Sequence, residues 1–400
     1  MKIPFSPPDI SEAEIEEVSN ALRSGWITTG PRTKELERQV AAFCGVNRAV
    51  CLNSQTACAE MALRLLGVGE GDEVITSAYT YTATASVICH VGAKPVLVDT
   101  RQDGLEMDYA QLERAITDKT KVIIPVDIAG VPCDYDRIFS IVNGKKNLFV
   151  AKNDLQKSFG RIIVLADTAH AFGAVWHGKP VGSIADFSAF SFHAVKNFTT
   201  AEGGALTWQP REWLDDEKIY RKIQLFSLHG QSKDALAKTR LGAWEYDIVG
   251  TWFKCNMTDI AAALGLAQFK RYPAMLNRRR AIIEKYDGAF KSQGIKTLTH
   301  YCENYRSSGH LYITRIPDIN EEKRNDIIAK MAERGVACNV HYKPLPLLTA
   351  YKNLGFNIKD YPNAYKNYEN EITLPLYTSL TDEQIEYVIQ SYLETVREYL

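Results

Sequence analysis

Two apolar runs without alternation constrain the fold of this chain most strongly. Residues 122–126 (VIIPV) and 162–165 (IIVL) show no polar residue at every second position. Strands with one solvated face alternate, so continuous runs are typical of strands buried on both faces of a parallel sheet that helices cover. Segments with helical spacing alternate with such runs. The sequence therefore predicts an α/β fold whose large domain has three layers (α/β/α) around a mainly parallel sheet.

The length predicts a second, smaller unit. A chain of 400 residues is too long for one simple core, and its apolar fraction of 46% is ample for burial. We predict an N-terminal segment (1–30), a large domain (31–270), a basic connecting helix (271–290) and a smaller C-terminal α+β domain (291–400). The sheet is expected to end at Gly204. The polar, lysine-rich interval 144–160 is predicted to be an inserted surface loop.

The composition argues against several classes of partner. The net charge is -1 and no block of like charges would follow a phosphate backbone, so no nucleic-acid partner is expected. Residues 1–22 are acidic without an apolar core, and no stretch approaches the roughly 20 apolar residues of a membrane span, so we expect neither a signal peptide nor a membrane segment. The eight cysteines form no C-x-x-C pair. They are interpreted as reduced residues of a cytoplasmic protein, and no metal site is expected.

A polar loop carries the most distinctive chemistry of the chain. The aromatic run 187–192 is predicted to be a strand, and it leads into a loop with Ser191, His193 and Lys196 that closes on a glycine pair. Glycines let the backbone approach a bound group closely, and a lysine shielded from water has a lowered pKa. Lys196 is therefore predicted to be a nucleophile toward an aldehyde.

Three further features match the needs of a pyridoxal phosphate enzyme, which requires a carboxylate at the ring nitrogen, an anion site for the phosphate and a flat partner for the ring. Asp167 follows the second apolar run, at the sheet edge where ligands bind in open α/β folds. Ser54, Gln55 and Thr56 open a predicted helix whose free N–H groups attract an anion. Tyr81 is the flat partner. Singly, each has an ordinary interpretation as a cap, a salt-bridge partner or a packing residue; the combination predicts the cofactor.

At these residues the sequence resembles the DegT/DnrJ/EryC1/StrS family of nucleotide-sugar aminotransferases, which have the type I fold of pyridoxal phosphate enzymes. The resemblance covers nearly the whole chain. Its motifs are SGWITTGP (24–31), GDEVI (71–75), GAKP (92–95), DTAHA (167–171), SFH and KN (191–197), EGG (202–204), NMTD (256–259) and VHY (340–342).

The resemblance implies a role for each site residue. Lys196 would bind the aldehyde of pyridoxal phosphate, Asp167 would meet the pyridine nitrogen, and His170 would lie beside the ring. The phosphate and ring contacts would come from Ser54, Gln55, Thr56, Ser191, His193 and Tyr81. Asn256 would reach the phosphate from a second subunit, which implies a homodimer with two shared sites.

The activity implied is transfer of an amino group from L-glutamate to a keto-sugar nucleotide, and the motifs are most similar to the members that aminate C4. Amination at C3, a cyclitol ketone as acceptor and sugar dehydration are the alternatives. Relatives that dehydrate the sugar replace the lysine by histidine, so Lys196 favours transamination. A non-catalytic protein with this fold would be expected to lose the lysine or the aspartate, and both are present.

The sugar-nucleotide pocket is harder to assign. Its candidates are Trp26, Thr29, His310, His341 and Tyr342, each of which would also suit an interface or a core. Two features depart from the family. Gln55 stands where the family usually has a small residue, and the interval 144–160 is longer than the usual connection.

Overall fold

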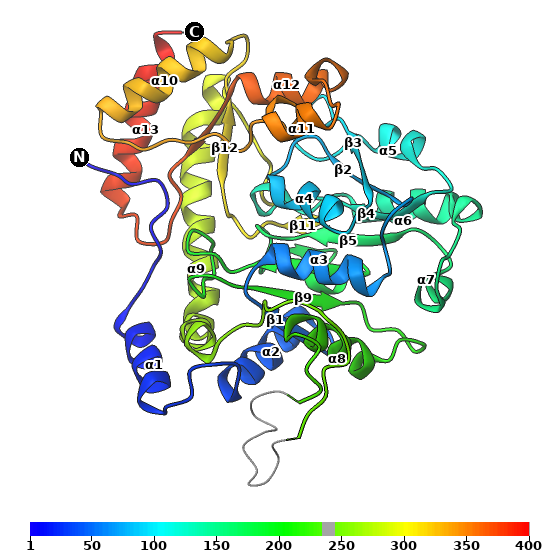
Figure 1. Ribbon diagram of the computed structural model, residues 1–400. Helices are drawn as coiled ribbons and strands as arrows, with labels where there is room; N and C mark the ends of the chain where they lie inside the picture. Colours follow the sequence, from blue (N-terminus) through cyan, green and yellow to red (C-terminus); the bar gives the residue numbers. More distant parts are fainter. Residues whose placement is uncertain (234–244, 400) are drawn as a thin grey trace.

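A seven-stranded sheet forms the centre of the computed structural model, which describes residues 1–233 and 245–399 (Figure 1). The strands lie in the order β1 (Ala49–Leu52), β9 (Gly204–Trp208), β8 (Phe187–Ser191), β5 (Ile163–Asp167), β4 (Thr120–Ile124), β2 (Glu73–Ser77) and β3 (Lys94–Val98). All neighbouring pairs are parallel except those of β9, which is antiparallel to both β1 and β8. The predicted α/β fold with a mainly parallel sheet is confirmed.

Helices cover both faces of this sheet, which explains the continuous apolar runs. One face packs against α3 (Gln55–Leu65), α4 (Thr82–His90) and α8 (Asp216–Ser227). The other face packs against α2 (Pro31–Cys44), α5 (Tyr109–Ala115), α6 (Tyr135–Gly144) and α9 (Asp259–Phe290). Both β4 and β5 are buried along their whole length, as strands between two helical layers must be.

The sheet does not end at Gly204, as the sequence predicts, but gains β9 there. Gly204 opens this strand directly beneath the start of α3, where an added Cβ would lie 2.5 Å from the backbone nitrogen of Gln55. The absence of a side chain is therefore what allows β9 to enter between β1 and β8. The strand was missed because a glycine pair followed by only four residues gives a weak strand pattern.

The connecting helix is longer than predicted. A single helix, α9 (Asp259–Phe290), includes the predicted connector and begins twelve residues before it, with Pro273 inside it. It leads to a sheet of β10 (Lys296–Thr297), β12 (Tyr312–Arg315) and β13 (Glu371–Leu374), packed with α10 (Glu321–Glu333) and α13 (Asp382–Arg397). The N-terminal helix α1 (Glu12–Arg23) is tied to α9 by an ion pair of 2.8 Å between Glu14 and Arg271.

The C-terminal region also reaches back onto the large sheet. The first turn of the helix α12 (Pro362–Glu369) is bound by Asp99. The Asp99 carboxylate accepts hydrogen bonds from the backbone nitrogens of Asn363 and Ala364 at 2.9 and 2.7 Å. Because Asp99 follows β3, this contact holds α12 at the carboxyl edge of the sheet. The boundaries of the large and small domains remain a prediction.

The interval 144–160 is not a surface loop but contains a docked helix, α7 (Asp154–Phe159). Asn153 caps its start and Gly160 ends it in the left-handed conformation. Gln156 is fully buried, and its amide donates to the carbonyl of Leu66 at the C-terminal end of α3, at 2.8 Å. The polar residues of this interval thus cap and anchor a helix, which composition alone does not reveal. Within the described ranges, no helix has both the length and the apolar character needed to cross a membrane.

A buried charge cluster next to β8 yields a stability prediction. The carboxylate of Asp186 is fully buried and binds Arg161 at 2.7 Å and Arg211 at 2.5 Å, and it accepts from the nitrogen of Val164 at 2.9 Å. Asp186→Ala leaves these partners without the anion, so the free energy of unfolding should fall by about 3 kcal/mol.

Urea denaturation of the two proteins measures this difference. The control is Glu303→Ala at an exposed position, which should change the free energy by less than about 0.5 kcal/mol. A value for Asp186→Ala as small as that of the control would contradict the role assigned to the cluster.

Candidate active site

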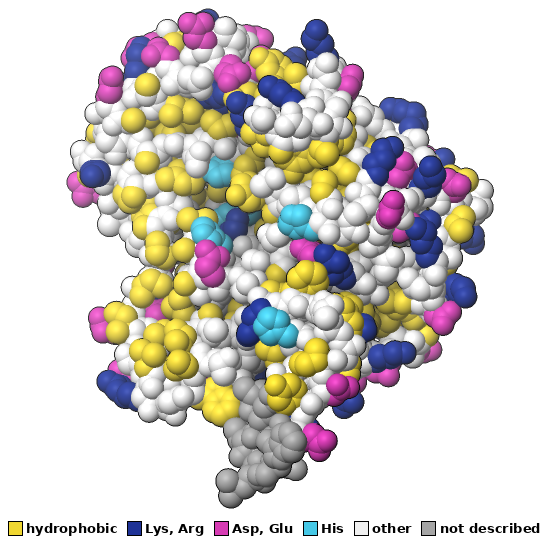
Figure 2. Space-filling model, viewed as in Figure 1, with side chains coloured by type: hydrophobic (Ala, Val, Ile, Leu, Met, Phe, Trp, Pro, Cys, Tyr) yellow, Lys and Arg dark blue, Asp and Glu magenta, His cyan; other side chains and the backbone are white. Residues whose placement is uncertain are grey.

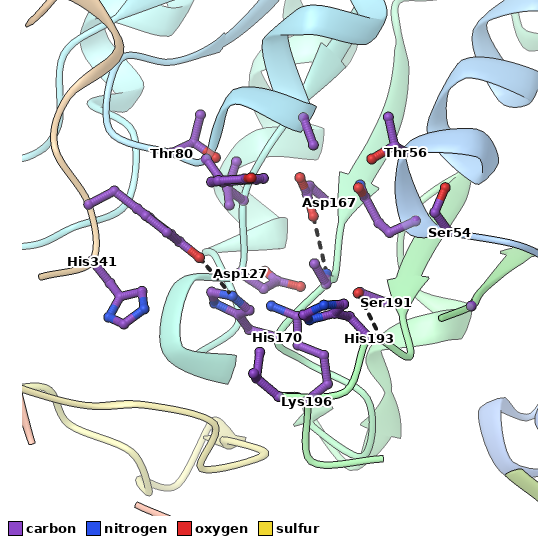
Figure 3. A pocket seen from close by; sticks show the side chains of 18 of the residues that line it. Ser54, Thr56, Thr80, Asp127, Asp167, His170, Ser191, His193, Lys196 and His341 are labelled. Carbon is purple, nitrogen blue, oxygen red and sulfur yellow. Dashed lines mark hydrogen bonds between the residues drawn. The ribbon is translucent and has the colours of Figure 1, made fainter. Parts of the chain in front are cut away.

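A cavity of about 560 Å³ opens at the carboxyl ends of the parallel strands. Figure 3 shows Asp167, His170 and Lys196 facing this cavity, with Ser54 and Thr56 at the start of α3 and His341 on the opposite side. Histidine side chains gather near the middle of the face shown in Figure 2. The structure brings together these predicted site residues: Ser54, Gln55, Thr56, Tyr81, Asp167, His170, Ser191, His193, Lys196, His341 and Tyr342.

Lys196 lies in the loop that follows β8. Its backbone nitrogen donates to the carbonyl of His193 at 2.9 Å, which turns the chain tightly at this point. Burial lowers the pKa of Lys196 to about 8, although the nearby charge of Asp167 acts in the opposite direction. The amine therefore loses its proton more readily than an ordinary lysine and is more available as a nucleophile.

Asp167 is the last residue of β5, and its carboxylate is held by two neighbours. One oxygen accepts from the hydroxyl of Thr84 at 2.6 Å, and the other accepts from the backbone nitrogen of Ala169 at 3.1 Å. Burial raises the pKa of Asp167, whereas Thr84, Ala169 and the charge of Lys196 favour the carboxylate. The group is thus fixed in position and needs a cationic partner, which a protonated ring nitrogen would supply.

His170 has a defined tautomer. Its Nδ1 accepts a hydrogen bond from the backbone nitrogen of Ala129 at 3.2 Å, so this nitrogen carries no proton. Burial, with Lys196 and His341, lowers the pKa of His170 well below its usual range, so the ring is neutral. The proton is therefore on Nε2, which donates to the hydroxyl of Tyr342 at 3.1 Å. The hydroxyl proton of Tyr342 is therefore available for a hydrogen bond to a group bound in the cavity.

The start of α3 fits the phosphate of the cofactor. Ser54 is the N-cap of this helix, and its side chain accepts a hydrogen bond from the backbone nitrogen of Ala57 at 3.0 Å. Ser54 also lines the cavity, so it serves as a cap and as part of the site at once. The first N–H groups of a helix have no partner within it and attract anions. The side-chain amide nitrogen of Gln55 is buried and has no hydrogen-bond partner among the described residues, and an anion would satisfy it.

Four predicted residues lie outside the cavity. Asn256 donates to the hydroxyl of Thr29 at 2.5 Å, and the indole of Trp26 donates to the carbonyl of Thr29 at 3.2 Å, so these three residues form one cluster. His310 lies behind His170, with ring centroids 4.3 Å apart, and its Nδ1 donates to Asn197 at 2.8 Å. His310 thus supports the loop of Lys196 and does not contact the cavity.

Sequence reasoning missed Thr84 and Asp127. Asp127 lines the cavity, and its carboxylate accepts from the backbone nitrogen of Cys133 at 2.9 Å and from the hydroxyl of Tyr135 at 2.8 Å. Burial raises the pKa of Asp127 to about 7. Asp127 follows the apolar run of β4 just as Asp167 ends that of β5, so the same pattern would have found it. Thr84 has no such signal, because its contact with Asp167 joins two distant segments.

A half-buried lysine of lowered pKa, a fixed carboxylate and a helix start whose free N–H groups suit an anion line one cavity at the edge of a mainly parallel sheet, and this combination matches the needs of a pyridoxal phosphate enzyme. Residues 8–392 match the DegT/DnrJ/EryC1/StrS aminotransferase family, and the chain belongs to it. It is an aminotransferase, and pyridoxal phosphate is its cofactor.

Relatives of similar length support this assignment. The spore coat polysaccharide biosynthesis protein SpsC of Bacillus subtilis is 38% identical over 99% of this chain and 97% of its own. The UDP-4-amino-4-deoxy-L-arabinose–oxoglutarate aminotransferase of Shewanella sediminis is 35% identical over 98% of each chain. Among solved structures, Spr1654 of Streptococcus pneumoniae, a provisionally assigned sugar aminotransferase in its PMP form, is 58% identical with a TM-score of 0.97 over 100% of both chains.

The lowered pKa of Lys196 predicts how the protein takes up its cofactor. The deprotonated amine is the nucleophile, so the rate at which cofactor-free protein binds pyridoxal phosphate should rise with pH and level off near the pKa of about 8. An ordinary lysine would give a rate that rises until about pH 10.4. Stopped-flow absorbance between pH 6 and 10.5 measures this profile.

Two variants define the signal in that experiment. Lys196→Ala should remove the visible absorption of the lysine-bound cofactor, whereas Lys343→Ala, at an exposed position, should keep it. A rate still rising at pH 10, or unchanged absorption in Lys196→Ala, would contradict the assignment.

Proposed function

We propose that this protein transfers the amino group of L-glutamate to the C4 carbonyl of a keto-sugar nucleotide, forming a 4-amino sugar for polysaccharide, glycan or lipopolysaccharide synthesis. The observation that supports this proposal most is that the half-buried Lys196 and the buried Asp167 line one cavity and that each charge favours the other. The sugar and its position are supported by the Shewanella sediminis relative, whose name specifies a 4-amino sugar and oxoglutarate, the keto acid of glutamate.

The residues of the cavity have distinct tasks in this proposal. Pyridoxal phosphate, when bound, supplies an aldehyde for amine exchange and an electron sink. Lys196 Nζ would take the proton from the α-carbon of the amino donor and, in the second half-reaction, deliver a proton to the sugar carbon that receives the amine, a task for which its pKa of about 8 is suited. Asp167 keeps a proton at the ring nitrogen, because a buried carboxylate stabilises a cation next to it. Thr84 holds the carboxylate in place.

The entrance of the cavity suits a polar substrate. His193 and Glu202 lie 3.5 Å apart on its rim, and both side chains are exposed. A volume of about 560 Å³ falls within the range of small-molecule sites and leaves room for a sugar above the ring. The nucleotide would extend from this entrance toward solvent.

A panel of acceptors tests the proposed function. The protein, pyridoxal phosphate and glutamate are incubated with 3-keto and 4-keto nucleotide sugars and with cyclitol ketones, and products are identified by mass spectrometry and NMR. We expect an amine at C4 of a 4-keto sugar, because the name of the Shewanella sediminis relative specifies a 4-amino sugar, and no product with Lys196→Ala. Amination at C3, conversion of cyclitol ketones alone, or loss of a sugar hydroxyl without amination would each replace this function with the corresponding alternative.

We further propose that the active unit is a homodimer with two shared sites, located in the cytoplasm. Asn256, with Thr29, lies outside the cavity of its own chain, as a residue contributed to a second subunit would. Exposed apolar side chains on α1 and on the segment 248–253 support an interface; they are Ile15, Leu22, Ile248, Val249 and Phe253. All eight cysteines lie within the described residues and are unpaired, which suits a reducing compartment.

Complementation tests the shared site. Lys196→Ala removes the amine, and Asn256→Asp places a negative charge where the phosphate of the partner's cofactor is expected, so each variant alone should be inactive. Mixing them under subunit exchange should restore about a quarter of the wild-type activity, because half of the dimers then contain one intact site. The controls are each variant alone and Lys196→Ala taken through the same subunit-exchange treatment without the second variant. A mixture that stays inactive although mass spectrometry detects heterodimers would contradict the shared site.

A further inference from the structure

His341 is held in place by both its backbone and its ring. Its backbone nitrogen donates to Glu371 at 2.9 Å, and its carbonyl accepts from the hydroxyl of Tyr79 at 2.9 Å. The ring stacks on Phe5, with centroids 5.5 Å apart and an angle of 20° between the planes. Because His341 lines the cavity, this anchoring fixes the direction in which its ring faces a bound substrate.

A short relay sets the position of the proton on this ring. The hydroxyl of Thr373 donates its single proton to the carboxylate of Glu371, so it can only accept from Nδ1 of His341, 2.9 Å away. Burial and the charge of Lys196 lower the pKa of His341 to about 3, so the ring is neutral and has one proton. That proton is on Nδ1. Nε2 has no hydrogen-bond partner among the described residues, and its lone pair is available as an acceptor.

The carboxylate at the end of the relay is fully buried. Burial raises the pKa of Glu371 to about 7, whereas Arg324 and Arg315 favour its charged form. A guanidinium nitrogen of Arg324 also donates to the carbonyl of Glu371 at 3.3 Å, which keeps this cation close. The relay described above is therefore the one present at pH 8.5.

We propose that Glu371, acting through Thr373, is a positioning residue that makes Nε2 of His341 an acceptor for a hydroxyl of the substrate sugar. This proposal rests on the proposed function and deepens it. The neighbouring Tyr342 presents the complementary group, since His170 donates to its oxygen and leaves its proton available. A sugar hydroxyl both donates and accepts, so it matches this pair. The ammonium group of the amino donor is the other N–H or O–H donor that could meet Nε2.

An amide at position 371 would reverse the relay. In Glu371→Gln the amide oxygen must still face the backbone N–H of His341, because that donor needs an acceptor. The NH₂ group then faces Thr373, whose hydroxyl turns to donate to Nδ1. The proton of the ring moves to Nε2, and the acceptor becomes a donor without a change in shape.

Nitrogen NMR reads this change directly. Holoenzyme labelled with ¹⁵N in its histidine rings is measured at pH 8.5, and His341→Asn identifies the signals of His341. In wild type, Nε2 should show the shift of an unprotonated ring nitrogen, and in Glu371→Gln that of a protonated one. Glu37→Gln makes the same chemical change at a buried carboxylate of α2, which accepts from Cys51 and Tyr220, and it should leave His341 unchanged. A protonated Nε2 in wild type, or an unmoved signal in Glu371→Gln, would overturn the relay.

Separate half-reactions identify the ligand. With the PMP form, the KM for the keto-sugar nucleotide should rise about ten-fold in Glu371→Gln, because a donor then faces the sugar hydroxyl. The half-reaction of the PLP form with glutamate should keep its KM. An effect on the glutamate half-reaction alone would assign Nε2 to the amino donor and overturn the sugar contact, as would an unchanged KM in both.

Thr373 supplies a second test that does not depend on the folding of Glu371→Gln. Thr373→Val removes the hydroxyl and should reproduce the rise in KM, whereas Thr373→Ser keeps the hydroxyl and should restore the wild-type value. Equal KM values for these two variants would overturn the relay. If no keto sugar is aminated by wild type, the proposed function fails, while the NMR signals of His341 still decide the relay.

Discussion

The pairing of the Lys196 amine with the buried carboxylate of Asp167 is the constraint on which the rest of this structure depends. Burial lowers the pKa of Lys196 and raises that of Asp167, and their attraction opposes both shifts, so neither charge is well placed without the other. The sheet holds the two segments in register, since Asp167 pairs with Ala189 of β8. The loop after β8 then closes on itself, because the nitrogen of Phe192 donates to the carbonyl of Gly203 at 2.8 Å. A rigid scaffold thus delivers both groups to one cavity.

The same loop is anchored from behind by the C-terminal half of the chain. Phe198 packs against Phe172, with centroids 5.1 Å apart, and the hydroxyl of Tyr272 on α9 donates to the carbonyl of Phe172 at 2.6 Å. Further along α9, the buried Arg279 donates to the carbonyl of His310, the residue that donates to Asn197 beside Lys196. The long helix therefore holds His310 behind the reactive loop and also reaches the C-terminal region, where Arg279 donates to the carbonyl of Leu376 at 3.1 Å.

The sequence predicts what depends on neighbouring residues and misses what depends on contacts between distant ones. The apolar runs, the loop of Lys196 and the aspartate at the end of β5 are visible because periodicity and strand ends are local properties. The roles of Glu371 in β13 and Thr84 in α4 cannot be predicted in this way, because they depend on contacts with His341 and Asp167, which are distant in the sequence. His310 is the reverse case. Its residue type suits a pocket, but the fold places it one layer behind the cavity.

The two departures from the family pattern meet on one helix, α3. Its N-terminus holds Gln55, which lines the cavity and whose buried side-chain nitrogen has no partner in the described part of the chain, and Gly204 of β9 lies directly beneath it. Its C-terminus is held by the inserted α7, through the amide of Gln156 on the carbonyl of Leu66. The attraction of a helix N-terminus for an anion falls off within about one turn. A small shift of α3 along its axis would therefore weaken the phosphate site, and anchoring both of its ends is a physical reason for a polar insertion to dock there.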